Sequence, residues 1–317
     1  MRKAISVAGY TLVIVALSAC GGKYDKPLEV ERTPRTGAYN YAGEYHGFEG
    51  AVSMGVTGGN LYVAYRDAGE VVRYTSRGNP VRDVMFNGVN QPFLVGVGRR
   101  EIAVADLEPS LAVKIYSLSG GDPLLTFGDP DWEMLGGLAI DDSGNVYVAD
   151  TERNFVRSYD SKGKPRFTVD LADSGFGVGH VLSPHGIFLD DLGLLISEAD
   201  PEKAQVQRIS IDEPQTAIWF SEQTPFITSF IDTVGNELNF MEPIDVSSDN
   251  DGHIFVLDRQ LSKIMRFTAD GGPDAIVNTI GAGGPDTLAN PVAIGTYGKK
   301  IYCLDAGTGI VHRWDAQ

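Results

Sequence analysis

Residues 144–163 read "GNVYVADTERNFVRSYDSKG": a turn, an apolar strand ending in Asp, a polar loop, a second strand and a second turn. Val, Tyr and Phe favour strands, whereas Gly and Asp favour the tight turns between them. Similar apolar strands end at six positions, Tyr65, Asp106, Asp150, Glu198, Asp258 and Asp305. Their spacings of 41, 44, 48, 60 and 47 residues indicate a repeat array.

Each repeat contains segments that predict four strands. The second is the apolar run, and the third alternates polar and apolar residues, as in "FVRSYDS" from 155. A fourth follows another turn, as in "PVRDVMF" from 80 and "KPRFTVD" from 164. Four antiparallel strands make one blade of a β-propeller. The sequence therefore predicts an all-β, six-bladed β-propeller with four-stranded antiparallel blades.

The sixth repeat stops at Gln317, directly after its third strand. Residues 37–48, "GAYNYAGEYHGF", precede the first repeat and have no other place in the pattern. An unpaired strand edge exposes a row of backbone donors and acceptors. We therefore expect this N-terminal segment to supply the missing outer strand and to close the ring.

The first 36 residues predict a targeting segment and a tether. Arg2 and Lys3 precede an apolar run at 4–19, which is short for a membrane-spanning helix of roughly 20 residues. "LSAC" at 17–20 resembles the lipobox of bacterial lipoproteins, which implies cleavage of residues 1–19 and lipidation of Cys20. The alternative is an ordinary signal peptide with an incidental cysteine. Residues 20–36 are polar and are expected to form a flexible tether before the propeller at 37–317.

The lipobox resemblance also implies a location in the bacterial cell envelope, periplasmic or surface-exposed. Gly21 follows Cys20, and under the enterobacterial sorting pattern this implies the outer membrane. Contact with the membrane is expected through the lipid alone. Cys303 then remains as a single cysteine in a strand-like run, and we expect it to be a buried apolar side chain.

Charge and motifs exclude several classes of function. The formal net charge is −16 and no Lys/Arg run is present, so we expect no nucleic-acid partner. There is no Gly-x-Ser-x-Gly elbow and no Gly-rich phosphate loop followed by Lys and Ser or Thr. We therefore expect no cofactor, and we assign no catalytic residue.

The repeat resembles the NHL-repeat family of six-bladed β-propellers. The pattern is Pro-x-x-apolar, an Asp/Gly turn, "GNVYVAD" and "VRSYDSKG"; it extends over 48–317 and matches best at 125–163. Tyr65 and Glu198 depart from the consensus Asp, which the resemblance implies is mainly structural. The family includes enzymes, RNA binders and interaction platforms, so the resemblance leaves the function open.

The long loops predict a binding surface. In a propeller, the loops that join blades and the loops between second and third strands share one face. The insertions at 171–184 and 222–243 are assigned to this face, the latter accounting for the spacing of 60. Candidate binding residues are Trp132, Phe176, His180, Phe226, Phe230 and Phe240, with Met241 beside them. The alternative is that these aromatics only pack their own loops onto the blades.

Charged residues on the same face are secondary candidates. Arg66, Arg153 and Arg259, with Asp67 and Glu152, are expected near the mouth of the central channel, although such side chains also serve solubility alone. The scaffold thus predicted would bind an envelope protein or another extracytoplasmic ligand. A metal-dependent hydrolase or lyase with its site at the channel is the alternative function.

The metal alternative depends on few residues. "SPHGIFLDDLG" at 183–193 resembles the Pro-His-Gly turn that carries a zinc ligand in the peptidyl-hydroxyglycine amidating lyases. The equivalent positions in this chain are Phe93, Gly137, Ile244 and Val292, so we expect His185 to line the channel as a lone binding residue without metal. Asp245 is the one inner-strand carboxylate that supports a lactonase-type calcium site, and "DNDG" at 249–252 is interpreted as a hairpin turn.

Overall fold

The computed structural model describes residues 39–170, 178–213, 216–221, 224–231, 235–278, 285 and 287–316, together with two short strands near the N-terminus. The chain divides into two units, Met1–Gly37 and Ala38–Gln317. In the first unit, β1 (Ile5–Val7) pairs antiparallel with β2 (Tyr10–Leu12). Cys20 lies outside the described residues. Among the residues described, no helix is long and apolar enough to cross a membrane.

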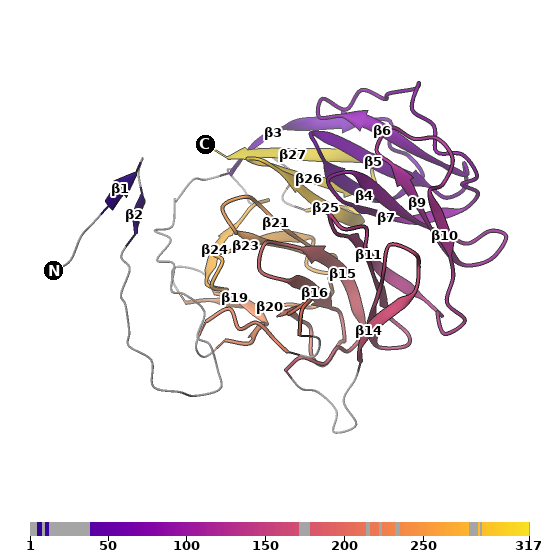
Figure 1. Ribbon diagram of the computed structural model, residues 1–317. Helices are drawn as coiled ribbons and strands as arrows, with labels where there is room; N and C mark the ends of the chain where they lie inside the picture. The colour runs from indigo at the N-terminus through magenta and orange to yellow at the C-terminus, as the bar shows by residue number, and fades with distance from the viewer. Residues whose placement is uncertain are drawn as a thin grey trace. The chain divides into compact units, whose positions relative to one another are not determined.

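The second unit is a six-bladed β-propeller (Figure 1). The innermost strands of successive blades contact one another all the way round, including β25 with β4. Blade 1 contains β4 (Ala51–Thr57), β5 (Asn60–Tyr65) and β6 (Glu70–Thr75); blade 2 contains β7 (Pro92–Val97), β8 (Glu101–Asp106), β9 (Ala112–Ser117) and β10 (Leu125–Phe127); blade 3 contains β11 (Leu135–Ile140), β12 (Val146–Asp150), β13 (Phe155–Tyr159) and β14 (Pro165–Asp170). Blade 4 contains β15 (Pro184–Leu189), β16 (Leu194–Glu198), β17 (Gln205–Ile209) and β18 (Phe226–Ile227); blade 5 contains β21 (Pro243–Ser248), β22 (Ile254–Asp258), β23 (Lys263–Phe267) and β24 (Pro273–Ile276); blade 6 contains β25 (Pro291–Tyr297), β26 (Lys300–Asp305), β27 (Ile310–Ala316) and β3 (Tyr39–His46).

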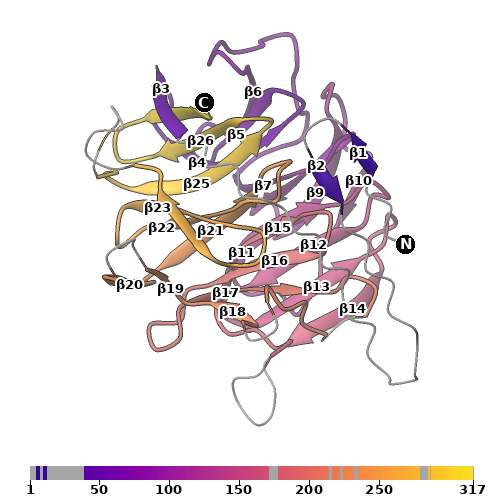
Figure 2. The ribbon, with the colours of Figure 1, turned by 90° about the vertical axis from the view of Figure 1, so that its left-hand side faces the viewer.

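The N-terminal strand closes the ring, as predicted. β3 pairs antiparallel with the C-terminal strand β27, from Tyr39 opposite Ala316 to His46 opposite Ile310. Purple β3 and the yellow C-terminal strands accordingly lie side by side (Figure 2). Because β27 runs away from the loops that join blades, Tyr39 lies on the opposite side of the propeller from those loops. We call the side with the interblade loops the loop face and the other side the turn face.

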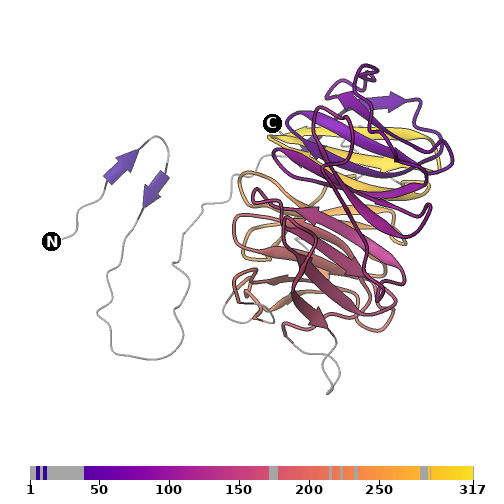
Figure 3. The same cartoon turned by 45° about the vertical axis from the view of Figure 1, so that its right-hand side comes forward.

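Six hydrophobic clusters stabilise the propeller, one at each interface between neighbouring blades. The sheets of the propeller stack side by side (Figure 3). The second strand of each blade is almost wholly buried. One blade alone cannot cover both faces of its sheet, so stacking provides the core. Cys303 on β26 is fully buried, as expected.

Blade 1 departs from the predicted four strands. The segment from Pro80 makes only one isolated bridge, to Tyr74, and a hydrogen bond from the Val81 amide to the Arg73 carbonyl. The chain then leaves the sheet, and Phe86 bridges to Gly121 of blade 2. Proline is not the cause, because the outer strands β14 and β24 begin with Pro165 and Pro273 in the same register. The fourth strand predicted from residue 80 is wrong.

Blade 4 holds its extra residues in another place than predicted. Ala217 already bridges to Ile209, and the Ile218 amide donates to the Arg208 carbonyl, so the outer strand begins before residue 222. The chain leaves this edge after Ile218 and returns to it at β18. The interval of 60 thus arises largely within the outer edge of the blade. The remainder of 222–243 includes the hairpin of β19 (Ser229–Ile231) and β20 (Glu237–Asn239).

Candidate functional site: the loop face and the channel mouth

In five of the six blades, a carboxylate at the end of the second strand anchors the loop that enters the same blade. Asp150 accepts the amide hydrogens of Glu133 and Met134 at 2.7 and 3.2 Å, and that of Arg153 at 3.0 Å. Equivalent sets surround Asp106, Asp258 and Asp305. A buried carboxylate that accepts several amide hydrogens is well satisfied. The repeated Asp therefore fixes the loop face.

The two departures from Asp make different junctions. The longer Glu198 accepts the amide hydrogen of Leu182 at 2.8 Å and side-chain hydrogens of Gln205 and Gln207. Burial raises the pKa of Glu198 to about 7, although these hydrogen bonds oppose the shift. Tyr65 instead bonds its hydroxyl to that of Tyr74 at 2.7 Å within the buried core. Glu198 therefore still holds the arriving loop, whereas Tyr65 bonds to the third strand of its own blade.

All six innermost strands carry a register irregularity at the same point, next to the loop face. Such β-bulges re-aim side chains and often lie beside functional sites. The residues at this position, one on the innermost strand of each blade, are Val52, Phe93, Gly136, His185, Ile244 and Val292. Four of them, Val52, Phe93, Ile244 and Val292, pack in or against the core clusters between blades. We call this ring of innermost-strand positions at the loop face the channel mouth. The structure corrects the predicted equivalent of His185 in blade 3 from Gly137 to Gly136. His185 is therefore the single polar residue among the six.

His185 presents a hydrogen-bond acceptor at this mouth. Its Nδ1 lies 3.1 Å from the Ser183 carbonyl oxygen, which can only accept, so Nδ1 carries the hydrogen and Nε2 has a free lone pair. Burial lowers the pKa of His185, and the charge of Arg259 acts in the same direction while Glu242 opposes it. The ring is therefore neutral near pH 7.

Asp245 lies on the neighbouring inner strand. Its Oδ2 accepts the Ile294 amide hydrogen at 2.8 Å, and burial raises the pKa of the carboxyl to about 7. A Cβ at Gly186 would lie 2.4 Å from the Asp245 Cα, so these strands approach more closely than a side chain allows. Ser53 accepts the Val95 amide hydrogen in the same way between blades 1 and 2. Asp245 thus joins blades.

The three predicted arginines lie on the loop face in different surroundings. Arg259 makes a two-nitrogen pair with Glu242, and Arg153 pairs with Glu133 at 2.8 Å. The Arg66 guanidinium lies 5.9 Å from the centre of the Phe93 ring, and it has no ion pair within the described parts of the chain. Arg66 is therefore the arginine of this set most open to an incoming anionic group.

Most of the predicted aromatic residues pack inward. Trp132 is 8% exposed, and its indole N–H donates to the Tyr159 hydroxyl at 2.9 Å. Phe230 and Phe240 are buried, and each contacts the Phe267 ring with centroids 5.9 Å apart. These three therefore stabilise loops on the blades and offer little surface to a ligand.

The other loop candidates differ in position. Phe226 begins the outer strand β18 and is half-buried, so it belongs to a blade edge. His180 directs Nδ1 to the Asp170 carbonyl at 3.1 Å. Phe176 lies outside the described residues. Met241 is 45% exposed on the loop before β21.

Sequence reasoning missed two apolar residues on the loop face. Leu107 is 38% exposed and Met134 is 44% exposed, next to the Asp junctions of blades 2 and 3. The sequence signal that could have identified Leu107 and Met134 was their position beside the repeated Asp residues or the loops that these residues hold. Within the described part of the chain, no three His, Cys, Asp or Glu side chains lie close enough to hold a metal ion.

Comparisons with known proteins agree with this architecture. The sequence model of the NHL repeat matches residues 134–159. A Bacteroides thetaiotaomicron protein of unknown function has a similar structure, with a TM-score of 0.60 and 15% identity over 88% of this chain and 73% of its own. Streptogramin B lyase has a TM-score of 0.54 and 16% identity over 87% of this chain and 84% of its own. A search among curated proteins found no match.

Fold and repeat together define a class, the six-bladed β-propellers. Within that class, residues 134–159 of this chain match the NHL repeat.

Proposed function

We propose that this protein is a lipid-anchored scaffold of the bacterial cell envelope that binds a protein or other extracytoplasmic ligand at its channel mouth. The observation that carries this proposal is the ring of six equivalent bulge positions, where His185 alone is polar. An apolar group with a hydrogen-bond donor suits that ring, because within the described residues the His185 Nε2 lone pair accepts no hydrogen bond. Arg66 and the exposed Leu107 and Met134 extend the surface outward.

The membrane part of the proposal rests on Cys20 and its lipobox-like context "LSAC". Mass spectrometry of the protein extracted from membranes of a bacterial host should find an acylated N-terminal Cys20. Cys20→Ser should release the protein from the membrane fraction. Retention of the Cys20→Ser variant in the membrane fraction would contradict the lipid anchor. It would not bear on binding at the channel mouth.

The binding surface is tested by capture from envelope extract on immobilised protein that lacks residues 1–20. Arg66→Glu and His185→Ala should each reduce capture of the same species at least several-fold. Arg77→Glu is the matched control, because Arg77 is exposed in a turn on the opposite face. Equal capture by all three variants would rule out the channel mouth.

An enzyme at the channel is the second candidate function. A neutral His185 and the Asp245 carboxyl, with a pKa raised to about 7 by burial, lie on adjacent inner strands and could exchange protons with a bound substrate. The similarity to streptogramin B lyase extends only to the fold. Metal analysis of purified protein tests the metal-dependent version: stoichiometric Zn²⁺ or Ca²⁺ would favour the enzyme over the scaffold.

A further inference from the structure

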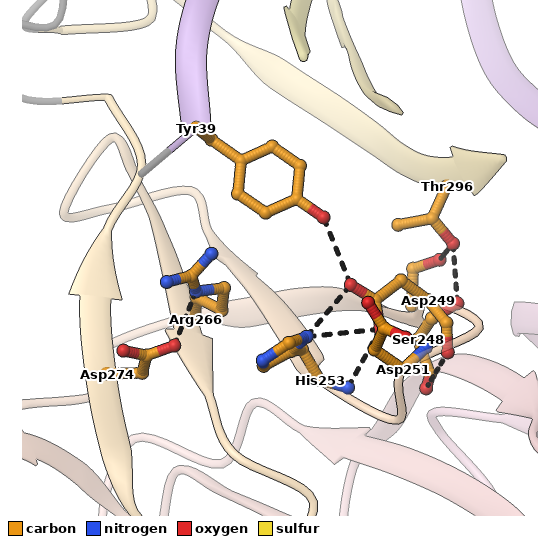
Figure 4. A network of polar contacts seen from close by, with 9 residues as sticks. Tyr39, Ser248, Asp249, Asp251, His253, Arg266, Asp274 and Thr296 are labelled. Carbon is orange, nitrogen blue, oxygen red and sulfur yellow. Dashed lines mark hydrogen bonds and ion pairs between the residues drawn. The ribbon is translucent and has the colours of Figure 1, made fainter. Parts of the chain in front are cut away.

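A buried polar cluster lies on the turn face, away from the channel mouth, where the closing strand begins (Figure 4). Tyr39, the first residue of β3, donates its hydroxyl hydrogen to Asp249 Oδ2 at 3.0 Å. Asp249 opens the turn between β21 and β22 and accepts the amide hydrogens of Asp251 and His253 at 2.9 Å each. This confirms the hairpin turn predicted at "DNDG".

Contacts across blades hold this turn in place. Thr296 on β25 of blade 6 donates its hydroxyl hydrogen to the Ser248 carbonyl of blade 5 at 2.6 Å. The Tyr39 ring packs edge-on against Phe255 with centroids 5.5 Å apart. β3 pairs with β27 in blade 6, yet Tyr39 contacts blade 5. The start of the closing strand is therefore attached to two blades.

His253 supplies the second part of the cluster. Its Nδ1 lies 3.0 Å from Asp249 Oδ2, and both side chains are largely buried. A second cation, Arg266 on β23, lies near His253. Its Nε is 2.7 Å from Asp274 Oδ2, and its guanidinium is 5.1 Å from the centre of the Tyr39 ring. A protonated His253 is therefore the cation placed directly against the Asp249 carboxylate that holds Tyr39.

We propose that Tyr39, Asp249 and His253 form a pH-responsive latch that holds the start of β3 firmly when His253 is protonated and loosens when it is neutral. With the imidazolium present, the buried Asp249 charge is paired and hydrogen-bonded. Loss of that proton leaves a largely buried carboxylate without its adjacent cation, which is costly. This change reaches the start of β3, because Tyr39 donates to the same carboxylate oxygen of Asp249.

The direction of the pH dependence follows from the surrounding charges. The hydrogen bond to Asp249 raises the pKa of His253 against burial; the Asp249 and Asp274 charges add to the rise and Arg266 opposes it. Burial alone would raise the pKa of Asp249, but the hydrogen bond and charge of His253 outweigh it and lower that pKa. Burial, Asp249 and Asp251 raise the pKa of Tyr39, so its hydroxyl remains a donor.

A raised histidine pKa stabilises the fold fully below the unfolded pKa, and this contribution is lost as pH rises through the folded value. A lowered carboxyl pKa stabilises the fold at pH values above the pKa of the unfolded state. This contribution is lost as the pH falls through the pKa of the folded state. The latch is therefore firmest in the weakly acidic range and loosens toward alkaline pH. Acidification from neutral pH tightens the closing strand.

Hydrogen exchange of the full chain, read at the peptide covering β3, tests the latch. After correction for the intrinsic exchange rate, protection near Tyr39 should be greater at about pH 6 than at about pH 8.5, by up to tenfold for each unit of raised pKa. His253→Gln should abolish this difference. Tyr39→Phe should lower protection at both pH values, because the bond to Asp249 is lost.

His46→Gln is the matched control. His46 lies at the other end of β3, exposed and 3.0 Å from Glu44, so this variant should keep the wild-type difference. The latch is overturned if wild-type protection does not change with pH, if the difference survives in His253→Gln, or if it disappears in His46→Gln.

Discussion

The carboxylate of Asp150 lies 2.7 Å from the backbone nitrogen of Glu133, and through this contact the last residue of one strand holds the loop arriving from the previous blade. The same contact recurs at four further blades with Asp or Glu. The most visible repeat in the sequence is therefore a joint between blades.

We expect Asp150→Ala to destabilise the propeller by about 3 kcal/mol, because three amide hydrogens lose their acceptor in a buried site. Thermal or urea unfolding measures the change. Asp142→Ala is the control: Asp142 is over half exposed and pairs with Arg99 at 3.4 Å, so its loss should cost about 0.5 kcal/mol or less. Similar losses in the free energy of unfolding for both variants would contradict the role of Asp150 in joining the blades.

The buried pair of Lys114 and Asp106, 2.7 Å apart, should respond unequally to removal of its two partners. Asp106→Asn leaves the Lys114 ammonium buried without its anion, at a cost of about 3–5 kcal/mol. Lys114→Met should cost about 1 kcal/mol, because Asp106 keeps its backbone donors. In blade 5, Met265 occupies the position equivalent to Lys114: Met265 pairs with Val256 as Lys114 pairs with Val104. Equal losses in urea unfolding would refute this asymmetry.

Trp132 is expected to act in stability and not in binding. Trp132→Phe should cost about 1 kcal/mol through the lost bond to Tyr159, and Trp132→Ala about 3–5 kcal/mol through a cavity among Phe127, Tyr159 and Leu135. Calorimetry measures both. Ligand capture by the folded Trp132→Phe variant should equal that of the wild type. A loss of capture without loss of stability would show that Trp132 takes part in binding.

The closing strand should contribute strongly to stability. Removal of residues 1–47 deletes β3 and exposes the edge of β27 and the core around Trp314, so the melting temperature should fall by more than 10 °C. Removal of residues 1–37 leaves the strand intact and serves as the control. Equal melting of the two truncations would contradict the closure.

Much of the fold could be predicted because its determinants are local and repeated. Strand alternation, turn residues and the spaced Asp indicate blades, and the missing last strand indicates where the N-terminus must pair. The outermost strands of the blades were harder to predict from the sequence. Ala217 and Ile218 form so short a strand piece before the chain leaves the edge that sequence placed the whole insertion in a loop.

The site was less predictable than the fold. An aromatic residue in a loop has the same sequence signal whether it turns outward or, like Trp132, inward against a neighbouring strand. Two consecutive glycines hide the register of a bulge, so the sequence pattern indicates Gly137 where the structure has Gly136. Ion pairs such as that of Arg259 with Glu242 depend on loops from different parts of the chain. Sequence thus locates the candidates but not their orientations.

The position of Tyr39 determines the face at which the N-terminal segment joins the propeller. The chain enters the propeller beside the Asp249 turn, on the side remote from His185. Under the proposed anchor, the chain would join the lipid on Cys20 to the propeller at this turn face. The bulged ends of the six innermost strands lie on the other face, so in the proposed scaffold attachment and binding would occupy opposite faces of the propeller.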